Sequence, residues 1–193
     1  MVTTSTVFPS NTKVTTIAAF NTALSGATAG DTITLANQTW QNAVINFSGK
    51  NGTAALPIVL RAETFDSVIF TGNSNLMIGG NYLIVEGLTF KNAVSASGDL
   101  VQFQSSGGTY ANHSRLAKSA FINCNPPSTT TSYRWVSMYG TYNRMDHCYF
   151  SGKNHSGPVF SVRRLEPNPN YALIDSNYFG YRPNLGVNGG ETI

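Results

Sequence analysis

Hydrophobic residues recur along this chain with a period of about thirty residues. Four times an aliphatic residue is followed five positions later by a phenylalanine, and the phenylalanines are 31, 29 and 29 residues apart. The pairs are Val85 and Phe90, Leu116 and Phe121, Met145 and Phe150, and Ile174 and Phe179. Short strand-forming stretches bounded by Gly, Asn and Ser lie between them. A period of this length without helical spacing indicates one solenoid coil per repeat.

This repeat predicts an all-β fold, a right-handed parallel β-helix. The aliphatic and Phe positions would face inward and stack from coil to coil, about 4.8 Å apart. The clearest strand patterns lie at 57–60, 67–70 and 82–85. A β-sandwich with coincidental spacing is the alternative fold, and four pairs in one phase favour the β-helix.

A short amphipathic helix is predicted before these strands, at residues 13–25. Ile17, Phe20 and Leu24 recur at intervals of three and four residues and form one apolar stripe. Such a helix would cap the open end of the solenoid and cover backbone groups that otherwise pair with another sheet.

The chain as a whole is predicted to be one domain. Residues 1–193 would form a single β-helix, with its coils running from about residue 31 to residue 193. A chain of this length can bury a core of its own.

Composition agrees with an extracellular solenoid. Charged residues make up 11% of the chain, against about 25% in an ordinary globular domain, so the polar surface must come from Ser, Thr, Asn and Gly. The net charge of +3 is too small to indicate a nucleic-acid partner, although a few well-placed cations would attract an acidic glycan. No stretch approaches the roughly 18 apolar residues that a membrane span needs, so we expect no membrane partner.

The cysteines and the first residues add two expectations. Cys124 and Cys148 lack metal-binding spacing and lie at different phases of the repeat, which argues against a disulfide. The first residues carry neither the basic region nor the apolar core of a signal peptide. We expect a secreted or periplasmic protein of bacterial type, with its signal peptide absent from this sequence.

The repeat also aligns acidic residues. Glu86, Asp146 and Asp175 each lie four residues before a phenylalanine, so Asp146 and Asp175 should be neighbours on adjacent coils. Paired carboxylates are what a glycoside hydrolase uses, with a separation of about 5–5.5 Å in retaining enzymes. The alternative is a structural role at a coil corner, with pairing to Arg144. We favour the structural role, for His147 as well.

Cations and aromatic residues gather in the last two repeats. Guanidinium and ammonium groups beside exposed rings suit an anionic sugar, because the charge meets the carboxylate and the ring faces meet the sugar plane. A solvated surface without a ligand is the alternative. The residues are Arg134, Trp135, Tyr139, Arg144, Lys153, Arg163, Arg164, Tyr181 and Arg182.

Several stretches together resemble polysaccharide lyase family 6, which contains alginate lyases and chondroitinase B. They run in order through the chain and end on the run Asn-Gly-Gly-Glu-Thr-Ile. The resemblance implies a right-handed parallel β-helix and β-elimination on a uronate-containing polysaccharide, most often alginate. The matching stretches are 30–33, 60–64, 70–72, 87–92, 134–140, 143–150, 152–153, 177–183 and 188–193.

The resemblance also implies site residues. In the family, calcium neutralises the substrate carboxylate, a lysine removes the adjacent proton and an arginine assists the leaving group. Asn188 matches the calcium-ligating asparagine of the family. Tyr139, Lys153 and Arg182 fall in segments near the substrate cleft, and Arg163 is a weaker candidate for the same role. The expected partner is therefore an anionic polysaccharide.

The chain departs from the family pattern at the catalytic residues. The family's paired calcium-binding glutamates, base lysine and acid arginine lie further along than Ile193, so no catalytic residue is assigned here. Calcium takes 6–8 oxygen ligands, and Asn188 alone should hold it weakly. The resemblance thus implies the N-terminal part of a lyase, inactive by itself. The rival hypotheses are the hydrolase using Asp146 and Asp175 and a non-catalytic module that binds anionic glycans.

Overall fold

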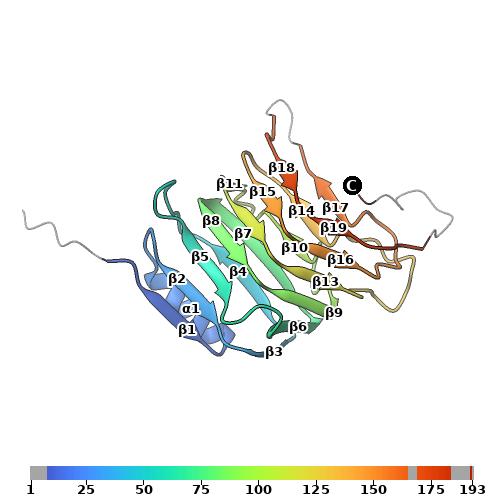
Figure 1. The fold of residues 1–193 in the computed structure, drawn as a ribbon, viewed down its shortest axis with the longest axis horizontal. Coiled ribbons are helices and arrows are strands. Elements are labelled where there is room, and N and C mark those ends of the chain that lie inside the picture. Colours follow the sequence, from blue (N-terminus) through green and yellow to red (C-terminus); the bar gives the residue numbers. More distant parts are fainter. Residues whose placement is uncertain (1–7, 165–168, 184–191, 193) are drawn as a thin grey trace, which may run out of the picture.

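The computed structural model is a parallel β-helix with one short helix at its N-terminal end, and it describes residues 8–164, 169–183 and 192. Strands of successive coils lie side by side along the long axis, from the N-terminal strands to the C-terminal ones (Figure 1). All strand pairs within the three sheets are parallel. The predicted fold class is confirmed.

Each full coil contributes a strand to each of three sheets, which we call the first, second and middle sheets, and one coil contributes both β10 and β11 to the middle sheet. The first sheet contains β1 (Asn11–Val14), β2 (Thr32–Leu35), β5 (Ile58–Ala62), β8 (Leu83–Glu86), β12 (Arg115–Ala117), β15 (Arg144–Asp146) and β18 (Leu173–Asp175). The second contains β3 (Gln38–Gln41), β6 (Val68–Asn73), β9 (Thr89–Val94), β13 (Ala120–Ile122), β16 (Tyr149–Ser151) and β19 (Tyr178–Phe179). The middle sheet contains β4 (Val44–Ser48), β7 (Asn75–Asn81), β10 (Val101–Gln102), β11 (Ala111–Asn112), β14 (Val136–Met138) and β17 (Phe160–Val162).

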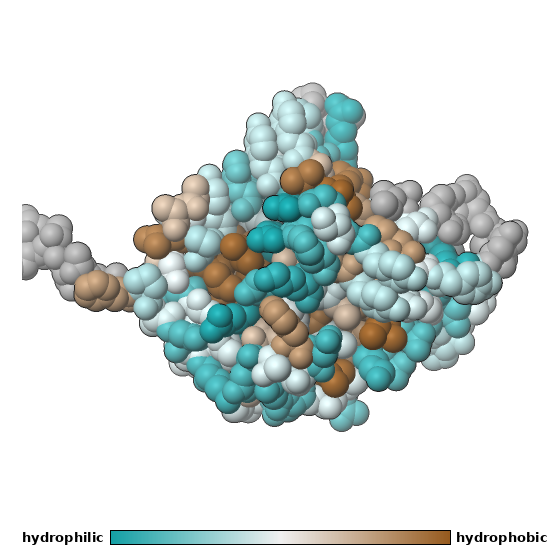
Figure 2. Space-filling view, in the orientation of Figure 1, coloured by the Kyte–Doolittle hydropathy of each residue, from teal (hydrophilic) through white to brown (hydrophobic). Residues whose placement is uncertain are grey.

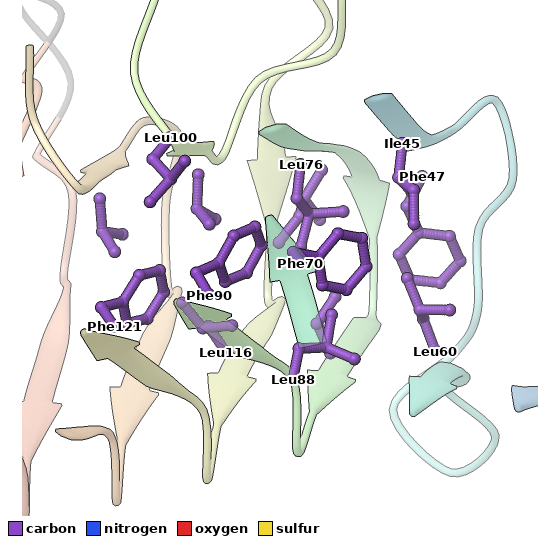
Figure 3. Close-up of a cluster of buried hydrophobic side chains, with 14 of the residues drawn as sticks. Ile45, Phe47, Leu60, Phe70, Leu76, Leu88, Phe90, Leu100, Leu116 and Phe121 are labelled. Atoms are coloured by element: carbon purple, nitrogen blue, oxygen red, sulfur yellow. The ribbon is translucent and has the colours of Figure 1, made fainter. Parts of the chain in front are cut away.

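The phenylalanine column predicted from the repeat forms the core of the second sheet. Phe90 pairs in register with Phe121, and Phe121 with Phe150. Their rings stack with centroids 5.2 and 4.8 Å apart and nearly parallel planes. Phe70 extends the row by one coil, since its ring lies 4.8 Å from that of Phe90 (Figure 3). Each ring thus fills the space that one strand spacing leaves.

The aliphatic column forms the inner face of the first sheet. Val85 pairs with Leu116, and Leu116 with Met145. These three side chains have no exposed surface. The face of the molecule seen in Figure 2 carries mainly hydrophilic residues, with hydrophobic ones in separate spots.

The capping helix exists but begins later than predicted. α1 spans Ile17–Gly26, whereas the prediction was 13–25. Residues 11–14 instead form β1, because they pair with β2 along its whole length. The hydroxyl of Thr16 accepts a hydrogen bond from the backbone N–H of Ala19 at 3.1 Å and so starts the helix.

The helix covers the end of the core as expected. Phe20 and Leu24 are buried, and the Phe20 ring meets Phe47 edge-on with centroids 6.4 Å apart. α1 lies against the first coil at the N-terminal end of the solenoid (Figure 1). Among the described residues, no helix has the length and apolar character that crossing a bilayer requires.

Cys124 and Cys148 are free and buried, in agreement with the argument against a disulfide. Burial raises the pKa of each thiol to about 12. Both are therefore protonated at neutral pH and act as small core side chains.

Candidate functional site

Two of the predicted sugar-contacting residues meet at one end of the middle sheet. Tyr139 follows β14 and Arg163 follows β17, and these strands pair with Met138 opposite Val162. This register places the Arg163 guanidinium carbon 5.9 Å from the centroid of the Tyr139 ring. Tyr139 in turn stacks on Tyr110, with centroids 5.7 Å apart. One cation and two rings are thus aligned along the solenoid.

The backbone holds this corner in place. The N–H of Arg163 donates to the carbonyl of Met138 at 2.8 Å. The side-chain amide of Asn170 donates to the carbonyls of Gly140 and Arg163, at 2.8 and 3.2 Å. Arg163 is exposed and Tyr139 partly so. A fixed guanidinium on an aromatic ring can bind a carboxylate while the ring contacts the sugar.

Lys153 lies in a different environment from the one predicted for it. Its side chain is buried, with only 1% of its surface exposed, at the corner before β17. Its ammonium nitrogen donates to the carbonyl of Tyr133 at 3.0 Å and lies 2.5 Å from Nε2 of His155. Burial, with a contribution from Arg182, lowers the pKa of Lys153 to about 6. The amine is therefore mostly neutral at pH 7.

His155 and Arg182 belong to the same buried corner. His155 has no exposed surface, and burial lowers its pKa to about 4. Arg182 donates through Nη2 to the carbonyl of His155 at 2.8 Å. The cavity lined by Lys153 and Arg182 measures only about 10 Å³, room for a single water rather than a sugar. In this structure Lys153 offers no surface to a polysaccharide, while Arg182 is partly exposed.

Asp146 and Asp175 are neighbours, as their spacing predicted. Arg115 binds Asp146 through two hydrogen bonds of 2.6 and 2.5 Å, and Arg144 binds Asp175 through two of 2.9 and 2.7 Å. The Arg115 hydrogen bonds lower the pKa of Asp146 to about 2, and Arg144 lowers that of Asp175. A glycosidase acid needs a raised pKa. These ion pairs therefore favour the structural role over the hydrolase.

His147 is part of the same structural network. It occupies a turn with φ of 54°, and its Nδ1 lies 2.6 Å from Asp146. Residues other than glycine rarely adopt a positive φ. The turn is repeated on the adjacent coils, where Lys118 and Ser176 have φ of 49° and 56°.

Asn188 lies outside the described residues. Within 8–164 and 169–183, no group of three or more His, Cys, Asp and Glu side chains is placed to hold a metal. Asp99, Asp146 and Asp175 are each bound by arginine. The residues that the structure describes thus do not fit a calcium site.

The sequence analysis missed an aromatic column on the outside of the solenoid. Tyr82, His113, Tyr142 and Tyr171 follow one another with ring centroids 4.8 Å apart. All four have φ between 48° and 57°, so stacking accompanies an unusual backbone turn. The sequence carries a signal for this column, because its four residues are separated by the same intervals of 31, 29 and 29 residues as the phenylalanines.

Comparisons with known proteins place this architecture in a family. A family model described as chondroitinase B matches residues 14–193. The structure of the PL6 family alginate lyase AlyGC is 39% identical, with a TM-score of 0.90. It is matched over 94% of this chain and 25% of its own. No curated protein sequence matched significantly.

Two further solved structures agree. A mannuronic acid specific family 6 lyase from human gut microbiota is 34% identical, with a TM-score of 0.87 over 93% of this chain and 43% of its own. The family 6 polysaccharide lyase Pedsa3628 from Pseudopedobacter saltans is 30% identical, with a TM-score of 0.84. The match covers 94% of this chain and 40% of that structure's chain. The chain thus spans less than half the length of these structures.

The family resemblance drawn from short motifs is confirmed by a match over nearly all of the sequence. The chain belongs to the chondroitinase B family, and its fold is that of the family 6 polysaccharide lyases.

Proposed function

We propose that this chain forms the N-terminal coils of a polysaccharide lyase that cleaves alginate by β-elimination. The supporting observation is the 34–40% identity to the PL6 family alginate lyase AlyGC and to a mannuronic acid specific family 6 lyase. Action outside the cytoplasm, where such polysaccharides occur, is part of the same proposal.

Within this proposal the chain binds the polysaccharide and does not perform the chemistry. The Arg163–Tyr139 corner supplies a cation and a ring face for a uronate unit. Arg182 is kept as a candidate sugar contact because it is partly exposed, but it follows β19, one coil beyond Lys153, and does not lie beside Arg163 and Tyr139. Lys153 is left out of this assignment because its amine is buried.

We propose that Asn188 is one calcium ligand and that the remaining ligands come from outside this chain. When bound, calcium would lower the negative charge of the substrate carboxylate. Asp99, Asp146 and Asp175 are bound by arginine and Asp31 accepts several hydrogen bonds, so we expect the chain by itself to bind calcium weakly.

Binding is tested by titrating alginate oligosaccharides into the purified chain and into Arg163→Ala, using calorimetry. We expect Arg163→Ala to weaken binding at least about tenfold, because a charge-assisted contact contributes about 1.5–3 kcal/mol. Arg61→Ala is the matched control, since Arg61 is exposed on β5 of the first sheet. Equal losses in both variants would refute the assignment of Arg163.

Catalysis is tested by ultraviolet absorbance, because β-elimination creates a conjugated double bond and hydrolysis does not. We expect no rise with this chain alone, with calcium or with chelator. A calcium-dependent rise would contradict the assignment of the chemistry to residues outside this chain. Release of saturated products would revive the hydrolase hypothesis.

A further inference from the structure

A groove crosses the outer face of the middle sheet, away from the Arg163–Tyr139 corner. Its volume is about 620 Å³. The floor is formed by outward side chains of β4, β7 and β10, and two loops, 96–98 and 104–108, form the walls. The lining residues on the floor are Val44, Asn75, Met77 and Gln102.

The lining of this groove carries no charged side chain among the residues that define it. Asn75 is 1% exposed, and its amide nitrogen donates to the carbonyl of Ser97 at 3.1 Å. Its Oδ1 has no hydrogen-bond partner among the described residues. This oxygen lies beneath the floor of the groove, and the exposed polar groups that a ligand can reach are the side-chain amides of Gln102 and Gln104.

The groove shares its sheet with the Arg163–Tyr139 corner. Asn46, Met77, Gln102, Ser137 and Ser161 occupy paired positions on five successive strands, from β4 to β17. Strands are about 4.8 Å apart, which is close to the length of one sugar unit. A polysaccharide bound at Arg163 and running along the solenoid axis would therefore reach the groove after a few units.

We propose that this groove is a distal subsite that binds uronate units of the same polysaccharide through their hydroxyl groups, leaving their carboxylates in solvent. The sugar hydroxyl groups meet the side-chain amides of Gln102 and Gln104, which are partly exposed. Val44 and Met77 contact the apolar faces of the sugar rings. The Arg163–Tyr139 corner thus selects an anionic polysaccharide, and the uncharged groove increases the number of sugar units that are bound.

This inference rests on the proposed function, and the test separates the two. An oligouronate disaccharide cannot reach from Arg163 to Val44 across four strand spacings of about 4.8 Å, but an octasaccharide can. We expect the octasaccharide to bind more tightly than the disaccharide. Added salt should weaken both alike, because the extra contacts are uncharged.

The decisive variant is Val44→Asp, which places a negative charge in the groove at a residue that is 44% exposed. We expect it to weaken octasaccharide binding about tenfold and to leave disaccharide binding nearly unchanged. Thr39→Asp is the matched control, since Thr39 is exposed on β3 of the second sheet. Its octasaccharide affinity should equal that of the unmodified chain.

Nuclear magnetic resonance locates the ligand directly. With octasaccharide, the side-chain amide signals of Asn75, Gln102 and Gln104 should shift together with signals of Tyr139 and Arg163. Shifts at Tyr139 and Arg163 alone would overturn the distal subsite and keep the proposed function. Shifts in the groove with the disaccharide would also overturn the distal arrangement. No shift at either place would refute both.

Discussion

At the scale of single residues, burial and pairing decide what the ionisable groups of this chain do. Asp146 has no exposed surface, and Lys153 exposes only 1% of its surface. Arg115 keeps the Asp146 carboxylate charged, whereas burial lowers the pKa of Lys153 and favours its neutral amine. The sequence analysis predicted Lys153 as a sugar contact and favoured a structural role for Asp146. The structure gives one of them an ion pair and the other a buried amine.

Arg115→Ala should destabilise the fold by about 3 kcal/mol, because it leaves the Asp146 carboxylate buried without its main partner. The folded pKa of Asp146 lies near 2, below its ordinary value of 3.8. Its contribution is therefore present above that ordinary value and is lost as pH falls towards 2. Chemical denaturation at pH 7 and pH 3 measures both effects. The control Lys13→Ala removes an exposed ion pair with Glu63, away from Asp146, and should cost much less.

Lys153→Met should flatten the dependence of stability on pH. The folded pKa is about 6 against an ordinary 10.5, so the unfolded chain binds more protons between these values. Stability of the unmodified chain should therefore rise with pH through this window. Lys91→Met, at an exposed position on β9, should keep the slope. An unchanged slope in Lys153→Met, measured by denaturation from pH 6 to 10, would contradict a buried amine.

At the scale of elements, the stacked column of phenylalanines holds the second sheet to the core. Phe121 lies between Phe90 and Phe150, with ring planes within 9° of parallel on both sides. Each strand of this sheet is only two to six residues long, so its stability depends on this stacking and on the pairing with adjacent coils.

Phe121→Ala should destabilise the protein by about 3–5 kcal/mol, since it removes a fully buried ring from a close-packed column. Thermal and urea unfolding measure the change. Phe65→Ala is the control, because Phe65 is 52% exposed and contacts Lys118. It should cost about 1 kcal/mol or less. Equal costs would mean that the column is not what stabilises this sheet.

At the scale of the whole molecule, the solenoid has an end that must be covered. α1 covers the N-terminal end with Phe20 against Phe47, and β1 adds a further strand beside β2. An uncovered end would expose core side chains and strand edges, which are sites for association with other chains.

Phe20→Asp should loosen this cap and cause concentration-dependent association. The buried charge costs several kcal/mol, and the helix would detach to hydrate it. Light scattering over a concentration series detects the effect. Asn21→Asp introduces the same charge at an exposed position of the same helix and should leave the scattering unchanged. Equal scattering from both variants would argue against the capping role.

Much of the fold could be predicted because a β-helix repeats in sequence as it repeats in space. The interval between Phe90 and Phe121 is one coil, so the sequence spacing is also the strand register. The helix boundary was missed by four residues, because the pairing of β1 with β2 overrides the helical pattern at Lys13. Tertiary pairing routinely decides such boundaries.

The candidate site was only partly predictable. The sequence placed Tyr139 and Arg163 near the sugar, and the structure brings the two together through the register of β14 and β17. The groove over β4, β7 and β10 was not predicted, because its floor comes from three coils and its walls from two loops. No local motif marks such a surface, since its residues are uncharged and common.

The sequence by itself determined the coil period, the inward columns, the capping helix and the family. Those properties depend on spacing and residue type, which are visible along the chain. Only the tertiary structure decided that Lys153 is buried, that Asp146 and Asp175 are bound by arginine, and that the neutral groove shares a sheet with Arg163. The physical reason is that burial and partners come from coils about thirty residues away, and small differences in corner geometry decide whether a side chain reaches solvent.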